Sequence, residues 1–249
     1  MDLATQIIKA LEDLAQPDRM RSKSHPTSQD YWHMGIDTPI IRKLAKRLSK
    51  AFRLQSWDDQ VAVIQHLLDY GSDEAAHLGV FLMAHAIDDV QAVDAPVFDA
   101  IVEAFRGWSV TDAFCIEVLQ PLLLRFPAAI LSLTAVWAQA ENRWKRRASV
   151  VVFVRKIGAS GRYTKQGLQA CERLIADSDD LVRKGVGWAL KDLMRGDHGT
   201  VLAYVEGLRA RGVPSVITRY ALRDIKGAER QQVLAIKPRT HDGINGGKQ

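Results

Sequence analysis

The sequence predicts an all-α protein, an α-helical solenoid of consecutive helix pairs. Three observations indicate this fold class: helical periodicity runs almost throughout the 249 residues, no convincing alternating strand occurs, and polar or Gly/Pro breaks define units that recur at roughly 35 residues. Hydrophobic residues make up 47% and charged residues 25%, values typical of a globular protein with a substantial core. An irregular helical bundle is the alternative.

The periodic segments carry their apolar residues on one face. In the segment 57–68, Val61, Ile64 and Leu68 fall on the same side of a helix. Breaks such as Gly71-Ser72-Asp73 place Ser or Asp where it can accept hydrogen bonds from the first backbone N–H groups of the next helix. Cutting the chain at these breaks predicts five helix pairs, at residues 56–87, 94–126, 128–157, 163–194 and 198–226.

We expect residues 1–236 to form a single domain of HEAT-like repeats. Two second helices share an Arg followed by small and apolar residues, at 145–149 and 182–186, and this pattern is typical of such repeats. The segment 237–249 is Gly-rich and predicted to be a disordered tail. The polar segment 19–30 is interpreted as an ordered loop or a mobile lip over a groove.

Charge is unevenly distributed along the chain. Residues 1–140 hold 12 Lys and Arg against 18 Asp and Glu, a net charge of −6, whereas residues 141–230 hold 19 against 10, a net charge of +9. Such asymmetry suggests that one part of the molecule faces a polyanion, with an Arg-rich solvated surface as the alternative.

The sequence also favours some cellular settings over others. Cys115 and Cys171 lie inside apolar helical patterns and are expected to be reduced core thiols of a cytoplasmic protein. No apolar run is long enough to span a membrane, and no leader is expected at the N-terminus. Because nucleotide-binding glycine loops, zinc-ligand spacings and nucleophile elbows are lacking, we expect no cofactor and no metal. His77 and His85 are interpreted as structural.

Candidate chemistry lies near the starts of three predicted helices. Trp108 and Asp112 are four residues apart and share a helix face, so a π surface and a carboxylate could line a developing cation. A core Trp with a capping Asp is the alternative.

Arg147 is expected to face inward, because Ala148 and Val151 are predicted core. Trp188 follows a helical glycine, which implies close packing. The residues Arg143, Lys145, Arg146 and Arg147 place four positive charges in five positions, a good phosphate site.

Several short motifs together resemble the DNA alkylation repair family of HEAT-like DNA glycosylases, the AlkD-type enzymes. The resemblance runs from about residue 5 to residue 226. Its anchors, in chain order, are Gly35-Ile36-Asp37-Thr38-Pro39 with the following Arg42, Lys43 and Lys46, then Trp108 and Asp112, Arg147-Ala148, and Gly187-Trp188-Ala189-Leu190.

The resemblance implies a right-handed superhelix with a basic concave groove that holds duplex DNA. It implies excision of cationic N3- and N7-alkylated purines in base excision repair, without a base-flipping pocket. By the same resemblance, Asp112 would be the catalytic carboxylate, Trp108 and Trp188 would lie against the deoxyribose, and Arg147 would contact a phosphate. The residues expected to bind DNA are Arg147, Arg143, Lys145, Arg146, Lys191, Arg42, Lys43 and Lys46.

The expected partner is double-stranded DNA with alkylated bases, bound by a monomer in the cytoplasm at the nucleoid. Departures from the family pattern put lesion preference in doubt: Asp37 stands in place of a glutamine, and Lys191 in place of an arginine. Tyr31 and Trp32 are candidates for an expected N-terminal tyrosine. A catalytically silent protein that binds DNA structures is the alternative function. A HEAT-like protein scaffold is disfavoured by the charge asymmetry.

Overall fold

The computed structural model describes residues 2–20 and 31–238. Over these residues the regular elements are all helical, and the one β-bridge joins Trp32 to Ser72 outside any strand. The predicted all-α class is therefore confirmed. Most of the lip expected at 19–30, and the tail expected from 237 onward, lie outside the described residues. Within the described ranges no helix has the length and apolar character that a membrane span requires.

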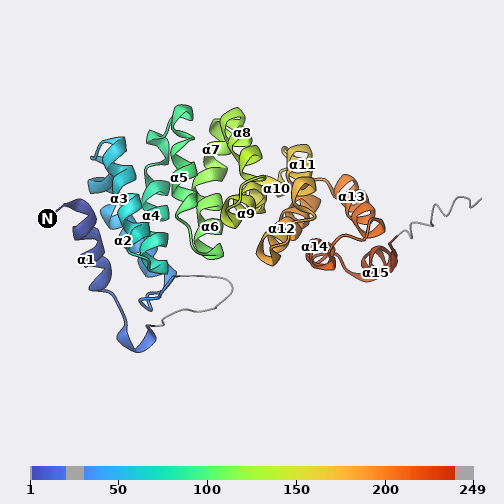
Figure 1. Ribbon diagram of the computed structural model, residues 1–249, viewed down its shortest axis with the longest axis horizontal. Helices are drawn as coiled ribbons and strands as arrows, with labels where there is room; N and C mark the ends of the chain where they lie inside the picture. Colours follow the sequence, from blue (N-terminus) through green and yellow to red (C-terminus); the bar gives the residue numbers. More distant parts are fainter. Residues whose placement is uncertain (1, 21–30, 239–249) are drawn as a thin grey trace, which may run out of the picture. The chain divides into compact units, whose positions relative to one another are not determined.

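The chain divides into two compact units, Met1–Val152 and Phe153–Gln249. Helices of the first unit form two layers (Figure 1), because α2 contacts α4, α4 contacts α6 and α6 contacts α9, whereas α1 contacts α3 and α3 contacts α5. Its helices are α1 (Leu3–Glu12), α2 (Thr38–Arg53), α3 (Trp57–Asp69), α4 (Asp73–His85), α5 (Val97–Glu103), α6 (Trp108–Phe114), α7 (Gln120–Arg125), α8 (Pro127–Trp137) and α9 (Arg143–Val151), with a π-helical turn η4 (Cys115–Leu119) between α6 and α7 and short 3₁₀ turns η1 (Pro17–Arg19), η2 (Ile87–Asp89) and η3 (Ala92–Asp94).

The second unit is organised around one long helix. Helix α12 (Asp180–Gly196) contacts α10 (Arg155–Ala159), α11 (Thr164–Leu174), α13 (His198–Ala210) and α14 (Ser215–Ala221). Helix α15 (Gly227–Ala235) packs against α13. The two compact units divide residues that the sequence predicted to form one domain, and whether they act as one domain stays a prediction.

Polar residues at the breaks cap the helices as predicted. The Ser72 hydroxyl accepts from the Ala75 N–H at 3.0 Å at the start of α4, and Asp179 accepts from the Leu181 N–H at 2.8 Å at the start of α12. Asn142 caps α9 through the Trp144 N–H at 2.8 Å. Each such bond satisfies a backbone donor that has no partner within the helix.

The predicted pair at 128–157 ends earlier than expected. Helix α9 ends at Val151, and Arg155 has a φ of 54°, a left-handed conformation that cannot continue a right-handed helix. The Arg155 N–H donates to Asp192 Oδ2 at 2.7 Å, and this bond from α12 compensates part of the strain. A separate short helix, α10, therefore replaces the end of the predicted helix.

Gly187 shows why a glycine occupies the middle of α12. A Cβ at this position would lie 2.6 Å from Tyr220 Cβ and 2.9 Å from the Ile217 carbonyl oxygen. Helix α14 approaches the α12 backbone too closely for any side chain. The close packing that the sequence predicted here is confirmed, and it accounts for the cost of about 1 kcal/mol that a helical glycine carries.

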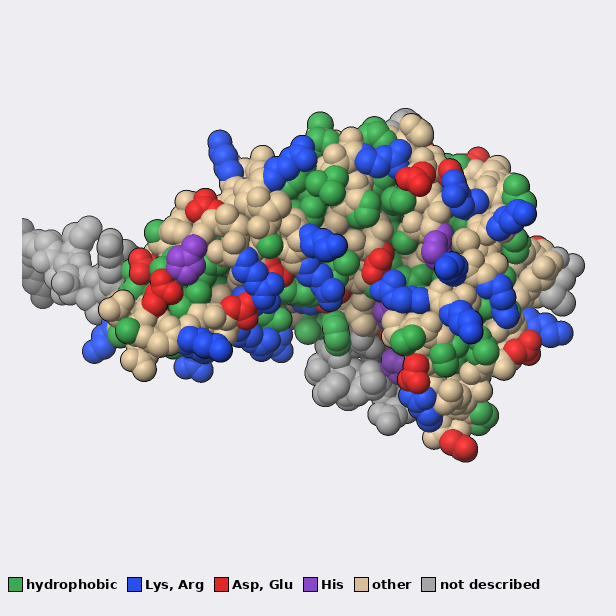
Figure 2. Space-filling view, turned by 180° about the vertical axis from the view of Figure 1, so that it is seen from behind, with side chains coloured by type: hydrophobic (Ala, Val, Ile, Leu, Met, Phe, Trp, Pro, Cys, Tyr) green, Lys and Arg blue, Asp and Glu red, His purple; other side chains and the backbone are tan. Residues whose placement is uncertain are grey.

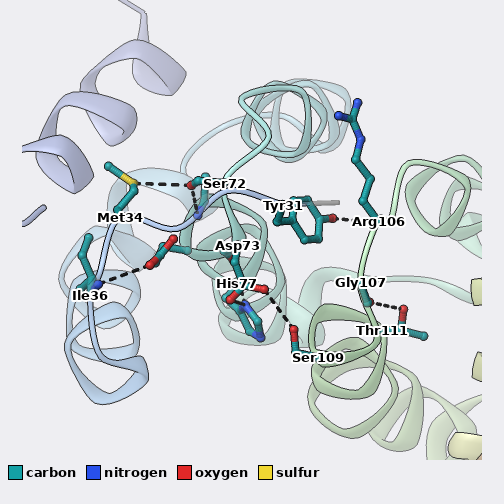
Figure 3. A network of polar contacts seen from close by, with 12 residues as sticks. Tyr31, Met34, Ile36, Ser72, Asp73, His77, Arg106, Gly107, Ser109 and Thr111 are labelled. Atoms are coloured by element: carbon teal, nitrogen blue, oxygen red, sulfur yellow. Dashed lines mark hydrogen bonds and ion pairs between the residues drawn. The ribbon is translucent and has the colours of Figure 1, made fainter. Parts of the chain in front are cut away.

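A buried ion pair lies at the start of α4. His77 Nδ1 is 3.0 Å from Asp73 Oδ2 and 2.8 Å from the Asp73 carbonyl oxygen, and both side chains are largely buried (Figure 3). Burial disfavours the imidazolium form, but the hydrogen bond and charge of Asp73 outweigh burial, so the pKa of His77 is raised. The same contacts lower the pKa of Asp73 despite its burial. The structural interpretation of His77 from sequence agrees with this position.

The raised pKa of His77 predicts a pH dependence of stability. Because the folded protein binds this proton more tightly, the contribution is fully present below the unfolded pKa of about 6.5 and is lost as pH rises through the folded pKa. The free energy of unfolding, measured with urea between about pH 6 and pH 9, should decline less steeply for His77→Gln than for the wild type. Equal slopes for the two proteins would contradict this assignment.

Candidate active site

Helix α6 presents Trp108 and Asp112 as the sequence predicted. Gly107 precedes the helix in an extended conformation, Trp108 is the first helical residue, and its side chain is 40% exposed. Asp112 follows one turn later and is buried. An exposed indole at the helix start is therefore adjacent, on one face, to a buried carboxylate.

A bidentate salt bridge joins Asp112 to Arg147 across 35 residues of sequence. Arg147 Nε donates to Asp112 Oδ1 and Arg147 Nη2 donates to Oδ2, both at 2.8 Å. The Arg147 side chain is 6% exposed and that of Asp112 is 10% exposed. Helices α6 and α9 are neighbours in one layer, so the inward orientation predicted for Arg147 brings its guanidinium onto this carboxylate.

The pair places an ionised carboxylate where solvent screens it weakly. A guanidinium stays protonated in proteins, and its planar fork matches both carboxylate oxygens. The neighbouring Cys115 thiol has a raised pKa, because it is fully buried and because Asp112 repels a thiolate. Asp112, and not the thiol, is thus the group suited to stabilise a positive charge here.

The other cations at the start of α9 have protein partners. Lys145 is buried, and its Nζ lies 2.9 Å from Asp99 Oδ1 and 2.7 Å from Glu103 Oε2. These carboxylates raise the pKa of Lys145 despite the opposing effect of burial. A lysine held in this way faces α5, so the expectation that Lys145 binds DNA is not supported by its position.

The two arginines at the start of α9 contact neighbouring parts of the chain. Arg146 Nη1 donates to the backbone carbonyls of Ala140 and Glu141. The Arg143 guanidinium stacks 4.4 Å from the Trp144 ring centroid.

Helix α2 carries the cations predicted from the N-terminal motif. Arg42, Lys43 and Lys46 are exposed. Arg42 donates to Glu117 at 2.6 Å and lies 4.0 Å above the Phe81 ring centroid, so α2 is tied to η4 and α4. Figure 2 shows one face of the molecule, where Lys and Arg side chains are frequent and interleaved with Asp and Glu.

Asp37, the acid that departs from the family pattern, is neutralised by a nearby arginine. Arg19 donates to Asp37 Oδ1 at 2.7 Å and to Oδ2 at 3.2 Å. The Arg19 guanidinium lowers the pKa of Asp37. A Cβ on Gly35, whose φ is +78°, would lie 2.7 Å from Arg19 Cβ, so a glycine is required for this approach. An unpaired carboxylate would repel a DNA phosphate, and the pairing with Arg19 reduces that repulsion.

Trp188 lies on α12 in the second unit, together with other charged residues. The half-buried indole has Arg155 above it, 5.9 Å from the ring centroid. Lys191 Nζ is 3.0 Å from Asp192 Oδ1 and 3.7 Å from Asp224 Oδ2. Because Trp188 and Trp108 belong to different units, their predicted convergence on one surface stays a prediction.

Sequence reasoning missed several residues around these indoles. Ser109, Asp73 and Arg155 contact or flank the predicted site residues, and only the i, i+4 spacing of Asp73 and His77 gave a local signal. Tyr31, a candidate for the N-terminal tyrosine of the family pattern, is fully buried, and its hydroxyl accepts from the Arg106 N–H at 3.1 Å. Its position is that of a core residue. Trp32 donates to the Tyr70 carbonyl at 3.4 Å.

The two cysteines and the possible metal ligands were also assigned a state from the sequence. Cys115 and Cys171 are both buried and unbridged, as the sequence predicted. Within residues 2–20 and 31–238, no group of three or more His, Cys, Asp or Glu side chains is arranged to hold a metal ion.

The fold and site define a protein of stacked helix pairs that carries a candidate catalytic carboxylate beside an exposed indole. The chain belongs to the DNA alkylation repair enzyme family, which it matches over residues 7–225. No curated protein matches the chain at a significant level.

Two solved structures show the same fold. A predicted DNA alkylation repair enzyme from Enterococcus faecalis is 16% identical with a TM-score of 0.68, and the match covers 80% of this chain and 90% of that one. The alkylpurine DNA glycosylase AlkC of Pseudomonas fluorescens, bound to DNA containing an abasic site analog, is 18% identical with a TM-score of 0.58, covering 77% of this chain and 56% of that one.

Proposed function

We propose that this protein is a DNA glycosylase that removes cationic N3- and N7-alkylated purines from duplex DNA. The observation that carries the proposal is that the Asp112 carboxylate lies one turn after the exposed Trp108 on α6, so that a carboxylate and an indole share one helix face. Family membership supports a role in DNA alkylation repair. The structural similarity to an alkylpurine DNA glycosylase agrees with the reaction type.

The proposed reaction breaks the bond between C1′ of the deoxyribose and the purine nitrogen. The electron pair of this bond moves to the base, which leaves as a neutral molecule because it already carried a positive charge. Positive charge then develops on the sugar, where the Asp112 carboxylate and the π face of Trp108 stabilise the oxocarbenium ion. A water oxygen adds to C1′, and the proton of this water is lost to solvent.

DNA binding would use exposed and partly exposed cations of the first unit. We assign this role to Arg42, Lys43, Lys46, Arg143 and Arg146. In the second unit we propose the half-buried Trp188 as a contact to DNA. Each phosphate contact should release about one counterion, so affinity should fall steeply with salt concentration. Lys145, Lys191 and Arg147 are left out, because carboxylates of the protein hold their charged groups.

The lesion's own charge should decide which bases are released. Asp112 is salt-bridged and therefore ionised, so it has no proton to give to a neutral leaving base. In single-turnover assays on matched duplexes, 7-methylguanine and 3-methyladenine should be released, whereas uracil and hypoxanthine should remain. Excision of uracil at a comparable rate would overturn the mechanism, because it requires a general acid or a base-specific pocket.

The second candidate is a protein that binds distorted DNA without cutting it. The observation that favours this function is that both Asp112 oxygens accept from Arg147 while the side chain is only 10% exposed. The two functions differ in one measurement, the release of methylated bases from alkylated duplex DNA under conditions where binding is saturated.

A further inference from the structure

A polar network connects α4 to the first turn of α6 (Figure 3). Ser109 Oγ donates to Asp73 Oδ1 at 3.0 Å, and the other carboxylate oxygen of Asp73 lies 3.0 Å from His77 Nδ1. Ser109 follows Trp108 directly in the chain. One oxygen of the Asp73 carboxylate therefore contacts His77 on the same helix, and the other accepts a hydrogen bond from the first turn of α6.

A second contact fixes the chain just before α6. The Arg106 N–H donates to the hydroxyl of the fully buried Tyr31 at 3.1 Å. The segment that contains Tyr31 is itself attached to α4, because the Asp73 N–H donates to the Trp32 carbonyl at 2.9 Å and Glu74 Oε1 accepts from the Gly35 N–H at 2.9 Å. Residues on both sides of Trp108 are therefore tied to the same helix.

The start of α6 needs such contacts because its local signals are weak. The helix spans Trp108–Phe114, and its N-cap Gly107 offers no side chain to accept from the first N–H groups. A glycine cap also leaves the backbone more conformational freedom than other residues would. Long-range hydrogen bonds from α4 supply the order that the local sequence does not.

We propose that Asp73 and Ser109, with His77 orienting the Asp73 carboxylate, are positioning residues that hold Trp108 and Asp112 in the geometry of the excision reaction. This inference rests on the proposed glycosylase activity. The hydroxyl of the network belongs to the residue that follows Trp108, so we expect the network to act on the chemistry through the first turn of α6.

The test compares Ser109→Ala with Ser109→Thr in single-turnover release of 7-methylguanine at saturating enzyme. We expect Ser109→Ala to be at least about 10-fold slower, because small misplacements of catalytic groups cost large factors in rate, while duplex Kd changes by less than about 2-fold. Ser109→Thr keeps a hydroxyl and should restore most of the rate. Ser160→Ala, which removes a hydroxyl bonded locally to the Ile157 carbonyl, is the matched control and should excise normally.

Hydrogen exchange of the 106–114 amides gives a readout that does not depend on activity. Exchange in this segment should be faster in Ser109→Ala than in the wild type or Ser109→Thr, with α9 unchanged. An unchanged excision rate in Ser109→Ala would overturn the inference, whether or not exchange rises. If the wild type releases no base, the proposed function fails, and the network is then tested by hydrogen exchange alone. Faster exchange of the 106–114 amides in Ser109→Ala would support the role of the network in ordering α6, and unchanged exchange would overturn it.

Discussion

Replacing Arg147 by alanine is expected to lower the free energy of unfolding by about 3–5 kcal/mol. The substitution leaves the Asp112 carboxylate buried without its bidentate partner, and an uncompensated buried charge is strongly destabilising. Urea unfolding followed by circular dichroism measures the difference. The matched control is Arg53→Ala, which removes an arginine from an equally bidentate pair with Asp89 that is exposed to solvent.

Arg53→Ala should cost far less, because the Asp89 carboxylate that it leaves without a partner is exposed to solvent. A loss in Arg147→Ala no larger than that in Arg53→Ala would show that the Asp112–Arg147 pair contributes little to the fold. The double variant Asp112→Leu/Arg147→Met replaces both charges by apolar groups and should recover much of the lost stability. The DNA affinity of Arg147→Ala must therefore be measured under conditions where the variant is fully folded.

Asp112→Asn is expected to slow single-turnover excision of 7-methylguanine by about 10²–10³-fold. The amide keeps the shape and one acceptor of the carboxylate, but it lacks the negative charge that stabilises the sugar cation. Duplex affinity should be retained or slightly raised, because one negative charge near phosphates is removed. Because the substitution leaves the buried Arg147 guanidinium without its charged partner, urea unfolding must first show that the variant is folded under the assay conditions. The assay then measures excision at saturating enzyme, together with Kd from fluorescence anisotropy.

Asp99→Asn is the matched control for this experiment. It changes the net charge of the first unit by the same amount, and it also removes a carboxylate that pairs with a cation, Lys145, but outside the proposed site. Its excision rate should stay near that of the wild type. If Asp112→Asn excised at the wild-type rate, the carboxylate would have no catalytic role and the function without catalysis would be favoured.

Local sequence patterns predicted most of the helices and part of the site. The period of the apolar residues indicated the helices, and Ser72 at a predicted break marked the start of one of them, because both signals operate within one turn of chain. The i, i+4 relation of Trp108 and Asp112 follows from helix geometry alone. The inward direction of Arg147 followed from its apolar neighbours.

The remaining features depend on contacts between distant residues. That Arg147 meets Asp112 follows from the packing of α9 on α6, and that Lys145 is buried between two carboxylates follows from the packing of α9 on α5. The left-handed backbone of Arg155 has no signature in residue type, since arginine rarely adopts it. It follows the extended Val154 in the break between α9 and α10, where the periodicity predicted a helix that continued to residue 157.

The Asp112–Arg147 pair also constrains how related sequences diverge. A lineage that lost catalysis would still be selected to keep both residues, because changing either one alone leaves the other as a buried charge without a partner. The stable apolar alternative requires that both residues change together. Trp108 carries no such penalty, since its side chain is 40% exposed. Among homologues, loss of the indole should therefore precede loss of the ion pair, and Trp108 is the more informative marker of an active enzyme.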